Sequence, residues 1–365
     1  MLVIVIELTF YCRIIKENYM QALILAGGKG TRLKPLTNNI PKSIVPVGNR
    51  PFLERQIQLL KKIGISDIIL SLNYQPAAIK KILGDGSALG VRLSYSIESV
   101  PMGTAGAYKF AEKSLKSTTV VLNGDILTDI DLGAVIEQHK KYNSTATIVL
   151  TKVENPSAYG LVEVGEDSQV LRFLEKPSLD DINRLKINTI NAGIYILEPR
   201  VLGFVPVCEN YSFEYQLFPD LLRQKEKFCA FIADNAYWLD IGTPQRYLQA
   251  NRDLLNGRIK NFQINRNGNS KISSEAEIDD ASLIAEDCVI KPRAKIINSV
   301  LGKDVVVEEH AIIRDSVIWS GTRINSHTNV LDSIVGNNCQ IGKNVFLTSG
   351  SVLSDNSFLN DFTCY

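Results

Sequence analysis

A glycine-rich segment near the start of the chain combines a flexible backbone with basic side chains. Residues 25–33 read LAGGKGTRL, and Lys42 follows in a Pro-Lys pair. Glycines after a strand let backbone N–H groups approach phosphate oxygens closely. The segment is not a Walker loop, because no Gly-Lys-Ser/Thr follows at the required spacing, and Leu33 stands where a dinucleotide-binding loop has its third glycine. We therefore predict a phosphate-binding loop of another type, against the alternative of a tight structural turn.

Two aspartates each follow a short apolar segment, where the carboxyl end of a buried strand would lie. Asp125 follows residues 119–123 and a glycine, and Asp240 follows Trp238 and Leu239. Magnesium binds one or two protein carboxylates and completes its shell with phosphate oxygens and water. Asp125 and Asp240 are therefore candidate magnesium ligands. The structural alternatives are a turn residue for Asp125 and a helix cap for Asp240.

The composition argues against several other kinds of function. Lysine and arginine total 40 and aspartate and glutamate total 39, and the resulting net charge of +1 argues against a nucleic-acid-binding protein. The three histidines form no HxxxH or HxH pattern, so no His-rich zinc site is predicted, and the six cysteines form no CxxC pair. The irregular cysteine spacing suits reduced thiols in the cytoplasm. The apolar start, residues 1–6, is too short to span a membrane and lacks the features of a signal peptide.

The elements that must position these residues alternate between strands and helices. Short apolar segments predict buried strands, and segments with apolar residues three or four apart predict helices. The expected strands are residues 22–26, 67–72, 91–97, 119–123 and 145–151, and the expected helices are residues 51–63, 77–83 and 132–142. This alternation predicts a mostly parallel, Rossmann-like α/β sheet covered on both faces. Ligands bind such sheets at the carboxyl ends of the strands, where the glycine-rich segment and Asp125 fall.

After about residue 265 a six-residue repeat of aliphatic residues replaces the helical pattern. The repeated positions are Ile278, Ile284, Ile290, Ile296, Leu301, Val307, Ile313, Ile318, Ile324, Val330, Val335, Ile341, Leu347 and Leu353. Three hexads form one coil of a left-handed parallel β-helix with the aliphatic side chains inside. Leu301, Ile318 and Val335 are 17 residues apart, which predicts a shortened corner in each coil. We expect about four coils, preceded by a linker at residues 257–270.

Together these motifs resemble those of the sugar-1-phosphate nucleotidyltransferases, also called sugar-nucleotide pyrophosphorylases. The resemblance begins with the glycine-rich segment and the Pro41-Lys42 pair and extends to the C-terminus. Further matches occur in the same order: Met102-Gly103-Thr104-Ala105, Asn123-Gly124-Asp125, Tyr159-Gly160, Phe173-Leu174-Glu175-Lys176-Pro177, Asn191-Ala192-Gly193 and Trp238-Leu239-Asp240-Ile241-Gly242. The match is especially close to the mannose-1-phosphate guanylyltransferases, which combine such a catalytic domain with a β-helical tail.

The resemblance implies transfer of a nucleotidyl group to a sugar 1-phosphate with release of pyrophosphate. The attacking phosphate is already an anion at neutral pH, so the reaction needs charge neutralisation and alignment rather than a general base. The resemblance implies catalytic roles for Arg32, Lys42 and Asp125, with Mg2+ held by Asp125 and Asp240. The alternative for Arg32 and Lys42 is a solvated surface charge.

By the same resemblance the remaining site residues divide into two sets. The nucleotide set is Leu25, Ala26, Gly27, Gly28, Gly30, Thr31, Glu98, Gly103 and Thr104, and the sugar-phosphate set is Gly160, Glu175, Lys176 and Asn191. Glu98 favours GTP, because a carboxylate accepts from both N1–H and N2–H of guanine, whereas thymine or uracil offers one donor there. We therefore expect synthesis of GDP-mannose from GTP and mannose 1-phosphate. The alternative for Asn191 is a hydrogen bond to backbone at the end of a strand.

Three rival functions remain open. The first is the same reaction with another sugar, such as a heptose 1-phosphate, or with UTP or dTTP. The second is a non-catalytic regulatory subunit that binds a sugar nucleotide, which loss of Arg32, Lys42 or Asp125 would have favoured; all three are present. The third is an additional acyl transfer on the β-helix, for which His310 and His327, 17 residues apart, are candidate bases. Exposed corner residues are the alternative for both histidines.

The chain is expected to divide into three segments. Residues 1–19 are a non-native or extra N-terminal extension with Met20 as the natural start, residues 20–260 form the catalytic domain, and residues 261–365 form the β-helix domain. The expected partners are GTP, or another nucleoside triphosphate, and a sugar 1-phosphate, with no nucleic acid and no membrane. Because the end coils of a β-helix expose sheet edges, we also expect a homo-oligomer that assembles through residues from about 271 onward.

Overall fold

The structure is a computed structural model that describes residues 19–185, 187–260, 262 and 269–365. The predicted N-terminal extension, apart from Tyr19, and half of the predicted linker lie outside the described residues.

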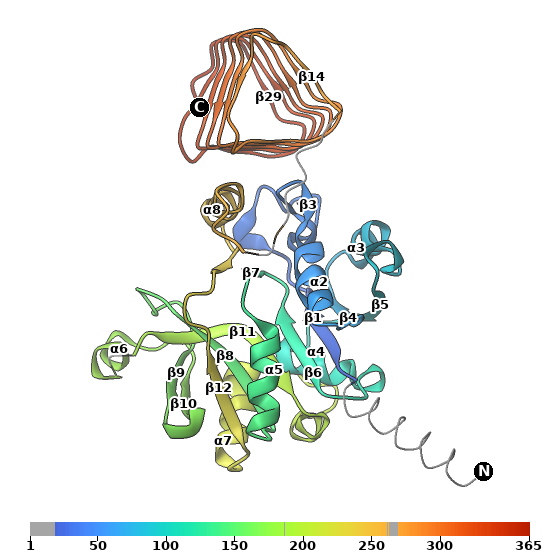
Figure 1. Ribbon diagram of the computed structural model, residues 1–365, viewed down its shortest axis with the longest axis vertical. Coiled ribbons are helices and arrows are strands. Elements are labelled where there is room, and N and C mark those ends of the chain that lie inside the picture. The colour runs from blue at the N-terminus through green and yellow to red at the C-terminus, as the bar shows by residue number, and fades with distance from the viewer. Residues whose placement is uncertain (1–18, 186, 261, 263–268) are drawn as a thin grey trace, which may run out of the picture. The chain divides into compact units, whose positions relative to one another are not determined.

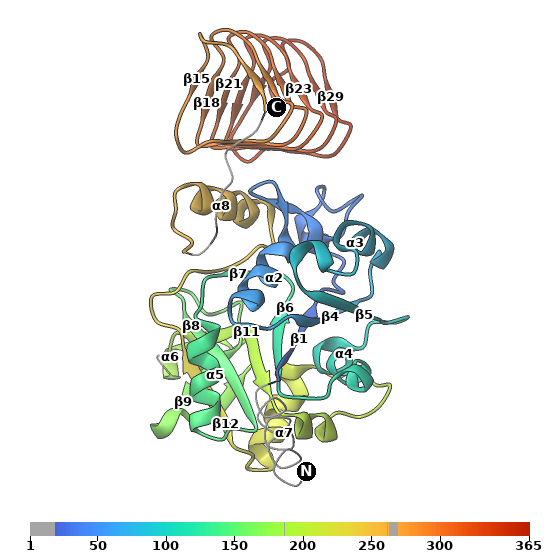
Figure 2. The same ribbon diagram turned by 45° about the vertical axis from the view of Figure 1, so that its right-hand side comes forward.

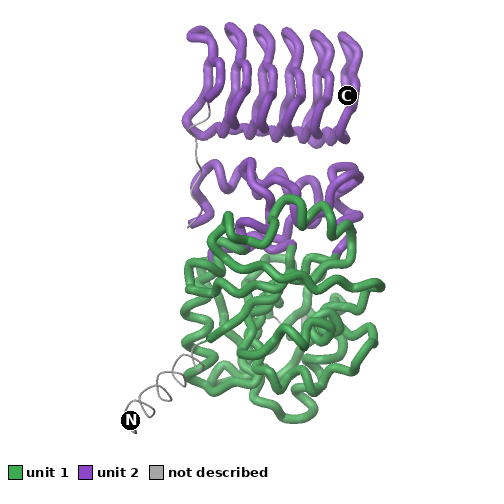
Figure 3. The backbone as a smooth tube through the Cα atoms, turned by 90° about the vertical axis from the view of Figure 1, so that its right-hand side faces the viewer, with its two compact units in different colours: residues 1–27, 57–124, 130–236 green, residues 28–56, 125–129, 237–365 purple. Residues whose placement is uncertain are grey.

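The chain forms two compact units (Figure 3). Unit 1 comprises residues up to 27, 57–124 and 130–236, and unit 2 comprises residues 28–56, 125–129 and 237–365. The division of the chain into residues 1–19, 20–260 and 261–365 stays a prediction.

Unit 1 is built on a nine-stranded sheet (Figure 1). Its strands are β1 (Gln21–Leu25), β4 (Asp67–Leu72), β5 (Arg92–Ile97), β6 (Thr119–Asn123), β8 (Ala146–Lys152), β9 (Leu161–Val164), β10 (Val170–Leu174), β11 (Thr189–Leu197) and β12 (Phe228–Ile232). Strands β5, β4, β1 and β6 lie in that order and run parallel, and β8 is parallel to β12. Strand β11 runs antiparallel to β6 and to β8, and the β9–β10 hairpin extends the sheet beyond it. The Rossmann-like sheet is confirmed, with β11 as an antiparallel addition.

The central strands form because their aliphatic side chains are buried on both faces of the sheet. Leu23 and Ile24 of β1 are fully buried, and the bounds predicted for β4 and β6 agree with the structure residue for residue. Leu25 at the end of β1 pairs with Asn123 at the end of β6. The N–H of Gly124 donates to the carbonyl of Leu25 at 2.9 Å, so the segments after the two strands start side by side.

None of the described helices is long and apolar enough to cross a membrane. They include α2 (Phe52–Lys62), α3 (Pro76–Leu83), α4 (Gly103–Phe110), α5 (Leu132–Lys141), α6 (Leu179–Leu185) and α7 (Phe218–Arg223), with a π-helical turn, η7 (Phe213–Leu217), before α7. The three predicted helices correspond to α2, α3 and α5. On one face of the sheet α4, η7 and α7 bury an aromatic cluster, in which the ring of Phe213 lies 5.0 Å from Tyr195 and 5.6 Å from Phe218, centroid to centroid.

Helix α5 begins at a capping aspartate, which gives a first test of the fold. The Asp131 carboxylate accepts a hydrogen bond from the N–H of Ala134 at 3.1 Å. We expect Asp131→Ala to lower the free energy of unfolding by about 1 kcal/mol, because a helix N–H then loses its acceptor. Urea denaturation followed by circular dichroism measures the change. Asp131→Asn keeps an acceptor and serves as the control, and an equal loss in both variants would contradict the capping role.

Unit 2 joins segments that are far apart in the sequence. It contains β2 (Pro46–Val47), β3 (Arg50–Pro51), β7 (Ile126–Thr128), β13 (Trp238–Asp240) and α8 (Pro244–Leu255). Strand β7 pairs antiparallel with β13, and α8 follows β13 directly. The side chain of Thr243 caps α8 by accepting from the N–H of Arg246 at 3.3 Å. The alternative interpretation of Asp240 as a helix cap is therefore wrong.

The C-terminal part of unit 2 forms the predicted β-helix, a prism with three parallel sheets as its faces (Figures 1 and 2). The first sheet contains β14 (Lys271–Ile272), β17 (Val289–Ile290), β20 (Val306–Val307), β23 (Arg323–Ile324), β26 (Gln340–Ile341) and β29 (Phe358–Leu359). The second contains β15 (Glu277–Ile278), β18 (Lys295–Ile297), β21 (Ile312–Arg314), β24 (Asn329–Leu331) and β27 (Phe346–Leu347). The third contains β16 (Leu283–Ile284), β19 (Val300–Leu301), β22 (Val317–Ile318), β25 (Ile334–Val335) and β28 (Val352–Leu353).

The predicted repeat describes the interior of this prism well. Its aliphatic residues from Ile290 to Leu353 are at most 4% exposed and form one core. The shortened corner lies between the second and third sheets, where Asn298, Asp315 and Asp332 have φ angles of 44°, 51° and 47°. The expectation of about four coils is wrong, because the first sheet has six strands and the others have five. Strands β14 and β29 extend the prism beyond the aliphatic positions used for that estimate.

The third sheet is apolar on its outer side as well as its inner side. The outward residues Leu283, Val300, Val317 and Ile334 are at most 3% exposed and belong to one core with residues of α8. The indole N–H of Trp319 donates to the hydroxyl of Tyr247 in α8 at 2.9 Å. Because both sides of this sheet are buried, consecutive residues along its strands are apolar, although one points into the prism and the next points outward.

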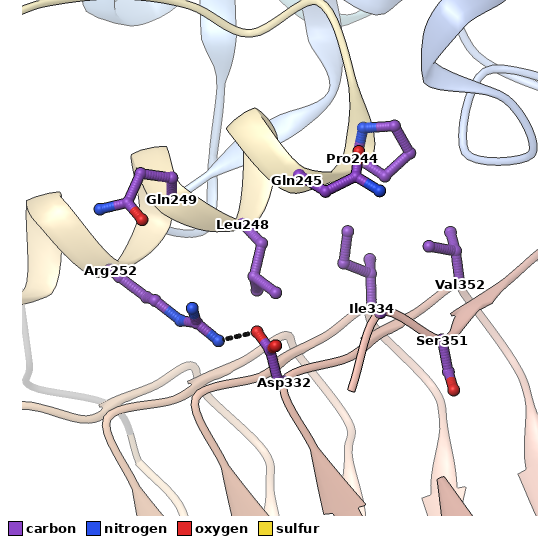
Figure 4. A pocket seen from close by; sticks show the side chains of 10 residues that line it. Pro244, Gln245, Leu248, Gln249, Arg252, Asp332, Ile334, Ser351 and Val352 are labelled. Carbon is purple, nitrogen blue, oxygen red and sulfur yellow. Dashed lines mark hydrogen bonds and ion pairs between the residues drawn. The ribbon is translucent and has the colours of Figure 1, made fainter. Parts of the chain in front are cut away.

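A small cavity remains between α8 and the third sheet. It has a volume of about 200 Å3, and Leu248 of α8 faces Ile334 and Val352 across it (Figure 4). Arg252 of α8 forms an ion pair with Asp332 at its edge. The helix that follows Asp240 is thus fixed to the prism by apolar contacts and by an ion pair.

Candidate active site

The part of the glycine-rich segment that belongs to unit 2, from Gly28 onward, folds onto Lys42. Gly30 has a φ angle of 63°, a left-handed conformation that glycine adopts without strain. A Cβ atom at Gly30 would lie 2.7 Å from the Cβ of Lys42, so a larger residue would collide there. The hydroxyl of Thr37 donates to the carbonyl of Gly30 at 2.8 Å. The segment is thus held against the lysine that is predicted to meet the triphosphate.

Lys42 is paired with Asp125, the other predicted catalytic residue nearby. The Lys42 ammonium donates to Oδ2 of Asp125 at 2.8 Å, and the lysine is only 9% exposed. A buried ammonium needs such a partner, because removing a lone charge from water is costly. Lys42 is therefore not the solvated surface charge of the alternative interpretation. Asp125 lies in a turn before β7 and keeps 33% of its side chain exposed, so its carboxylate remains accessible.

The pairing of β7 with β13 brings Asp240 next to Asp125, although the two are 115 residues apart in the sequence. Asp240 lies opposite Ile126 in this pair, and the N–H of Ile241 donates to the carbonyl of Asp125 at 3.0 Å. Asp240 is 7% exposed and forms an ion pair with Arg246. The structure therefore places the two aspartates predicted to hold a metal on neighbouring backbone segments.

Arg32 lies near Asp240 in unit 2. A Cβ atom on Gly242 would lie 2.9 Å from Oδ2 of Asp240 and 3.1 Å from Nη2 of Arg32, so both side chains converge on this glycine. Arg32 is exposed, in agreement with a role toward a ligand rather than in packing. Arg32, Lys42, Asp125 and Asp240 thus form one cluster of two cations and two carboxylates, which we call the unit 2 cluster.

The donor set of this cluster fits a hard divalent cation. Such ions take one or two carboxylates and complete their shell with water and phosphate oxygens. Among the described residues no group of three or more His, Cys, Asp and Glu side chains forms a metal site. A cation held by Asp125 and Asp240 would therefore draw its remaining ligands from phosphate and water.

The predicted nucleotide residues divide between the units. Gly28, Gly30 and Thr31 belong to unit 2, and Leu25, Ala26, Gly27, Glu98, Gly103 and Thr104 belong to unit 1. In unit 1 the N–H of Ala26 donates to the carbonyl of Ser71 at 2.9 Å, which holds the end of β1 against β4. Gly103 and Thr104 begin α4, and a Cβ atom on Gly103 would lie 2.6 Å from the carbonyl oxygen of Tyr211.

Glu98 has a structural role that the sequence did not predict. It directly follows β5, is 6% exposed, and accepts from the Ser71 hydroxyl at 2.8 Å and from the N–H of Met102 at 3.0 Å. These bonds fix the loop that leads into α4. A carboxylate offers about four lone-pair sites, so acceptor capacity remains beside these two bonds. Contact with a base stays a prediction.

The predicted sugar residues Gly160, Glu175 and Asn191 lie together in unit 1. A Cβ atom on Gly160 would lie 2.7 Å from Oε2 of Glu175, and the N–H of Asn191 donates to the carbonyl of Gly160 at 2.9 Å. The Asn191 side chain accepts from the N–H of Gly193 at 2.9 Å, which is the backbone bond of the alternative interpretation. Lys176 is exposed and has a φ angle of 48°, an uncommon conformation for a residue with a side chain.

Two known families match parts of this chain. Residues 21–257 match the nucleotidyl transferase family. The chain belongs to this family. Residues 262–363 match a second family, described as the EIF2B subunit epsilon LbH domain, in agreement with the left-handed β-helix of unit 2. The chain is therefore a nucleotidyltransferase with a β-helical tail, as the resemblance predicted.

Relatives and solved structures refine the family membership. Mannose-1-phosphate guanylyltransferase 1 of Arabidopsis thaliana is 35% identical over 283 residues, or 76% of each chain. Mannose-1-phosphate guanyltransferase of Debaryomyces hansenii is 41% identical over 235 residues, or 63% of each chain. Two crystal structures of HddC from Yersinia pseudotuberculosis, one of them complexed with GMP-PN, are also similar to this chain. The similarity covers 65% of this chain and 99% of the HddC chain, with 33% identity and a TM-score of 0.55.

One acidic residue near the predicted sugar residues had no signal in the sequence. Glu214 lies two residues after Ser212, which caps η7, so the pair does not have the three-residue spacing of a capping box. Its carboxylate contacts Thr104 of the predicted nucleotide set and Tyr195, which contacts Asn191 of the sugar set. Only the pairing of distant segments in the fold reveals this position.

Proposed function

We propose that this chain joins GTP and mannose 1-phosphate to give GDP-mannose and pyrophosphate, with Mg2+ as the cofactor. The observation that carries the proposal is the unit 2 cluster, in which Lys42 is paired with Asp125, Arg32 lies near Asp240, and the two aspartates are on neighbouring backbone segments. Phosphoryl chemistry of this kind depends on charge neutralisation and alignment. The sequence relatives named as mannose-1-phosphate guanylyltransferases support the choice of substrates.

In the proposed reaction a phosphate oxygen of the sugar 1-phosphate attacks the α-phosphorus of GTP. The new bond joins this oxygen to the α-phosphorus, and the bond to the bridging oxygen of the β-phosphate breaks, so that pyrophosphate leaves with the electron pair. No proton must be removed from the nucleophile. Lys42 and Arg32 bind the triphosphate, and Arg32 stabilises the charge that develops on pyrophosphate, because a guanidinium holds two phosphate oxygens at once. Bound Mg2+ would supply further charge neutralisation on the phosphates.

The contacts to the base and the sugar come from predicted residues of unit 1. Glu98 accepts from the guanine edge, and Gly103 and Thr104 form the floor under the base. Glu175 and Asn191 bind sugar hydroxyls, Gly160 lets backbone approach the sugar, and Lys176 binds its phosphate. The similarity to HddC, which has been crystallised with GMP-PN, supports a guanine nucleotide. Uridine and thymidine triphosphates and a heptose 1-phosphate are the competing substrates.

The assembly and location of the protein are further parts of this proposal. The free end coils of the β-helix suit a homo-oligomer, since pairing with another subunit covers exposed sheet edges. We place the protein in the cytoplasm. The five cysteines among the described residues are free thiols, which suits that compartment.

The test is an assay of pyrophosphate release from the purified protein with Mg2+. Four nucleoside triphosphates are combined with mannose, glucose and heptose 1-phosphates. We expect GTP with mannose 1-phosphate to give the highest kcat/KM. A higher kcat/KM for another pair would show that the protein catalyses the same type of reaction with other substrates. Binding without turnover for every pair would favour a regulatory subunit.

The role of Glu98 gives a separate prediction. Glu98→Gln replaces one acceptor oxygen with a donor that faces the donors of guanine, so the preference for GTP over UTP should shrink by about 1–3 kcal/mol. The ratio of kcat/KM for the two nucleotides measures this change. Because the Glu98 carboxylate also accepts a hydrogen bond from the N–H of Met102, the thermal unfolding temperature of the variant is measured as well. Reduced stability with an unchanged nucleotide ratio would show that Glu98 is purely structural.

A further inference from the structure

Glu214 occupies a position in unit 1 where three hydroxyl groups converge on its carboxylate. Oε2 lies 2.6 Å from the Ser212 hydroxyl and 3.0 Å from the Thr104 hydroxyl, and Oε1 lies 3.3 Å from the Tyr195 hydroxyl. The residue sits in the π-helical turn η7, a distortion that is common at functional sites. The turn therefore places one carboxylate between elements that are distant in the sequence.

The direction of each hydrogen bond follows from counting protons. The Thr104 hydroxyl already accepts from the N–H of Phe213 at 2.8 Å, and the Ser212 hydroxyl already accepts from the N–H of Glu214 at 3.1 Å. Each hydroxyl has a single proton, which is then directed to Glu214. Glu214 is thus a pure acceptor, as an ionised carboxylate is.

The third hydroxyl connects Glu214 to the predicted sugar residues. The side-chain amide of Asn191 donates to the hydroxyl oxygen of Tyr195 at 2.8 Å, and Tyr195 donates to Glu214. Tyr195 is fully buried, and burial together with the charge of Glu214 raises its pKa well above the ordinary value, so it remains a donor. The carboxylate therefore orients the amide of Asn191 through one buried phenol.

The charge of Glu214 also reaches the other sugar residue. The pKa of Glu175 is raised mainly by burial and further by the negative charge of Glu214, while Lys176 opposes both. We call the four predicted sugar residues together with Glu214 the sugar pocket, and it thus has two carboxylates and one exposed ammonium. Neutral sugar hydroxyls can donate to such a pocket, whereas a second anionic group on the sugar would be repelled.

We propose that Glu214 is a positioning residue that orients Asn191 through Tyr195 and restricts the sugar pocket to sugar 1-phosphates without a second anionic group. The proposal rests on the proposed function, since the sugar pocket is assigned there. Glu214 acts through its neighbours, because Ser212, Thr104 and Tyr195 occupy most of its acceptor capacity. It also joins the sugar residues to the first turn of α4, where the nucleotide floor is predicted.

The experiment compares two ligands that differ only in the group at C6 of the sugar. Isothermal titration calorimetry on the full chain gives Kd for mannose 1-phosphate and for mannuronic acid 1-phosphate, which carries an additional carboxylate. Glu214→Gln removes the charge and keeps an acceptor oxygen for Tyr195, while its new NH2 group can donate to the hydroxyl oxygens of Ser212 and Thr104. Glu214→Ala removes the whole network, and Tyr195→Phe removes only the link to Asn191. Glu198→Gln is the control, since Glu198 accepts from Thr118 at 2.8 Å elsewhere in unit 1.

We expect Glu214→Gln to reduce the preference for mannose 1-phosphate over mannuronic acid 1-phosphate by at least about 5-fold, because one of two repelling charges is lost. Tyr195→Phe and Glu214→Ala should each raise Kd for mannose 1-phosphate, by about 10-fold in the alanine variant. Glu198→Gln should leave both values unchanged. Thermal unfolding of every variant shows whether it still folds. If Glu214→Ala does not fold, Glu214→Gln still tests the effect of the charge.

The outcomes separate this proposal from the proposed function. Pyrophosphate release by the wild type with mannose 1-phosphate establishes the function alone. An unchanged ligand preference in Glu214→Gln, or normal mannose 1-phosphate binding in Glu214→Ala, would overturn the role of Glu214 and leave the function intact. A wild type that binds neither sugar 1-phosphate would overturn both.

Discussion

Asp125→Asn should lower kcat/KM by at least about 100-fold and raise the Mg2+ concentration needed for half-maximal rate. The carboxylate of Asp125 is the partner of the buried Lys42 ammonium, and the backbone of Asp125 neighbours that of Asp240. Asparagine keeps the shape of the side chain and removes its charge, so a proposed metal ligand and the partner of a buried cation are lost together. A loss of this size is typical when one major charge contact to a transition state is removed.

Two further variants make this test specific. Arg32→Ala should lower kcat/KM by a similar factor with little change in the Mg2+ requirement, because a guanidinium contacts phosphate and not the metal. Asp129→Asn is the matched control: Asp129 lies on the same segment, but its carboxylate accepts from the N–H groups of Tyr237 at 2.7 Å and Lys260 at 2.8 Å. The control should unfold at a lower temperature with a normal Mg2+ requirement. Normal Mg2+ dependence in Asp125→Asn would remove Asp125 from the metal site.

The sequence predicted the elements of the central sheet because their signals are local. The apolar segments at β4 and β6 and the apolar spacing in α2 and α5 depend on neighbours a few residues away. The prism interior was equally predictable, since the six-residue step is a local property of each coil. The 17-residue spacing located the shortened corner, where Asn298, Asp315 and Asp332 take left-handed conformations.

What the sequence did not provide is the pairing of distant segments. The proximity of Asp125 to Asp240 rested on resemblance alone, and it follows here from the register of β7 and β13. The antiparallel strand β11 inside a parallel region was missed for the same reason, because periodicity does not identify a partner strand. Glu214 belongs to this class, since its three hydroxyl donors come from α4, β11 and the cap of η7.

The β-helix is also closer to the candidate chemistry than a separate tail would be. One apolar core in unit 2 contains Leu33 and Val45 of the segment that holds Lys42, Tyr247 of α8, and Val317 and Trp319 of the prism. The helix that follows Asp240 is therefore buried against the third sheet. Damage to the prism should affect the position of this helix as well as assembly.

Ile324→Asp should lower the free energy of unfolding of unit 2 by several kcal/mol. Ile324 is fully buried inside the prism, surrounded by the aliphatic residues of neighbouring coils. An aspartate there has no polar partner, and burying an unpaired charge is costly. Differential scanning calorimetry of the full chain measures the loss. Gln340→Asp is the matched control, because Gln340 is exposed on the outer side of the same sheet, and it should unfold within a few degrees of the wild type.

The same variant tests whether the chain assembles through the prism. We expect light scattering to show a homo-oligomer for the wild type and for Gln340→Asp, and a shift toward monomer for Ile324→Asp. Truncation after Gly257 should also give a monomer, but it exposes the apolar face of α8 that packs on Val317 and Ile334. Its kcat/KM should therefore fall, even though Arg32, Lys42, Asp125 and Asp240 are all retained. A monomeric wild type, or a truncated chain with the same oligomer, would show that the prism does not mediate assembly and acts only as a support for α8.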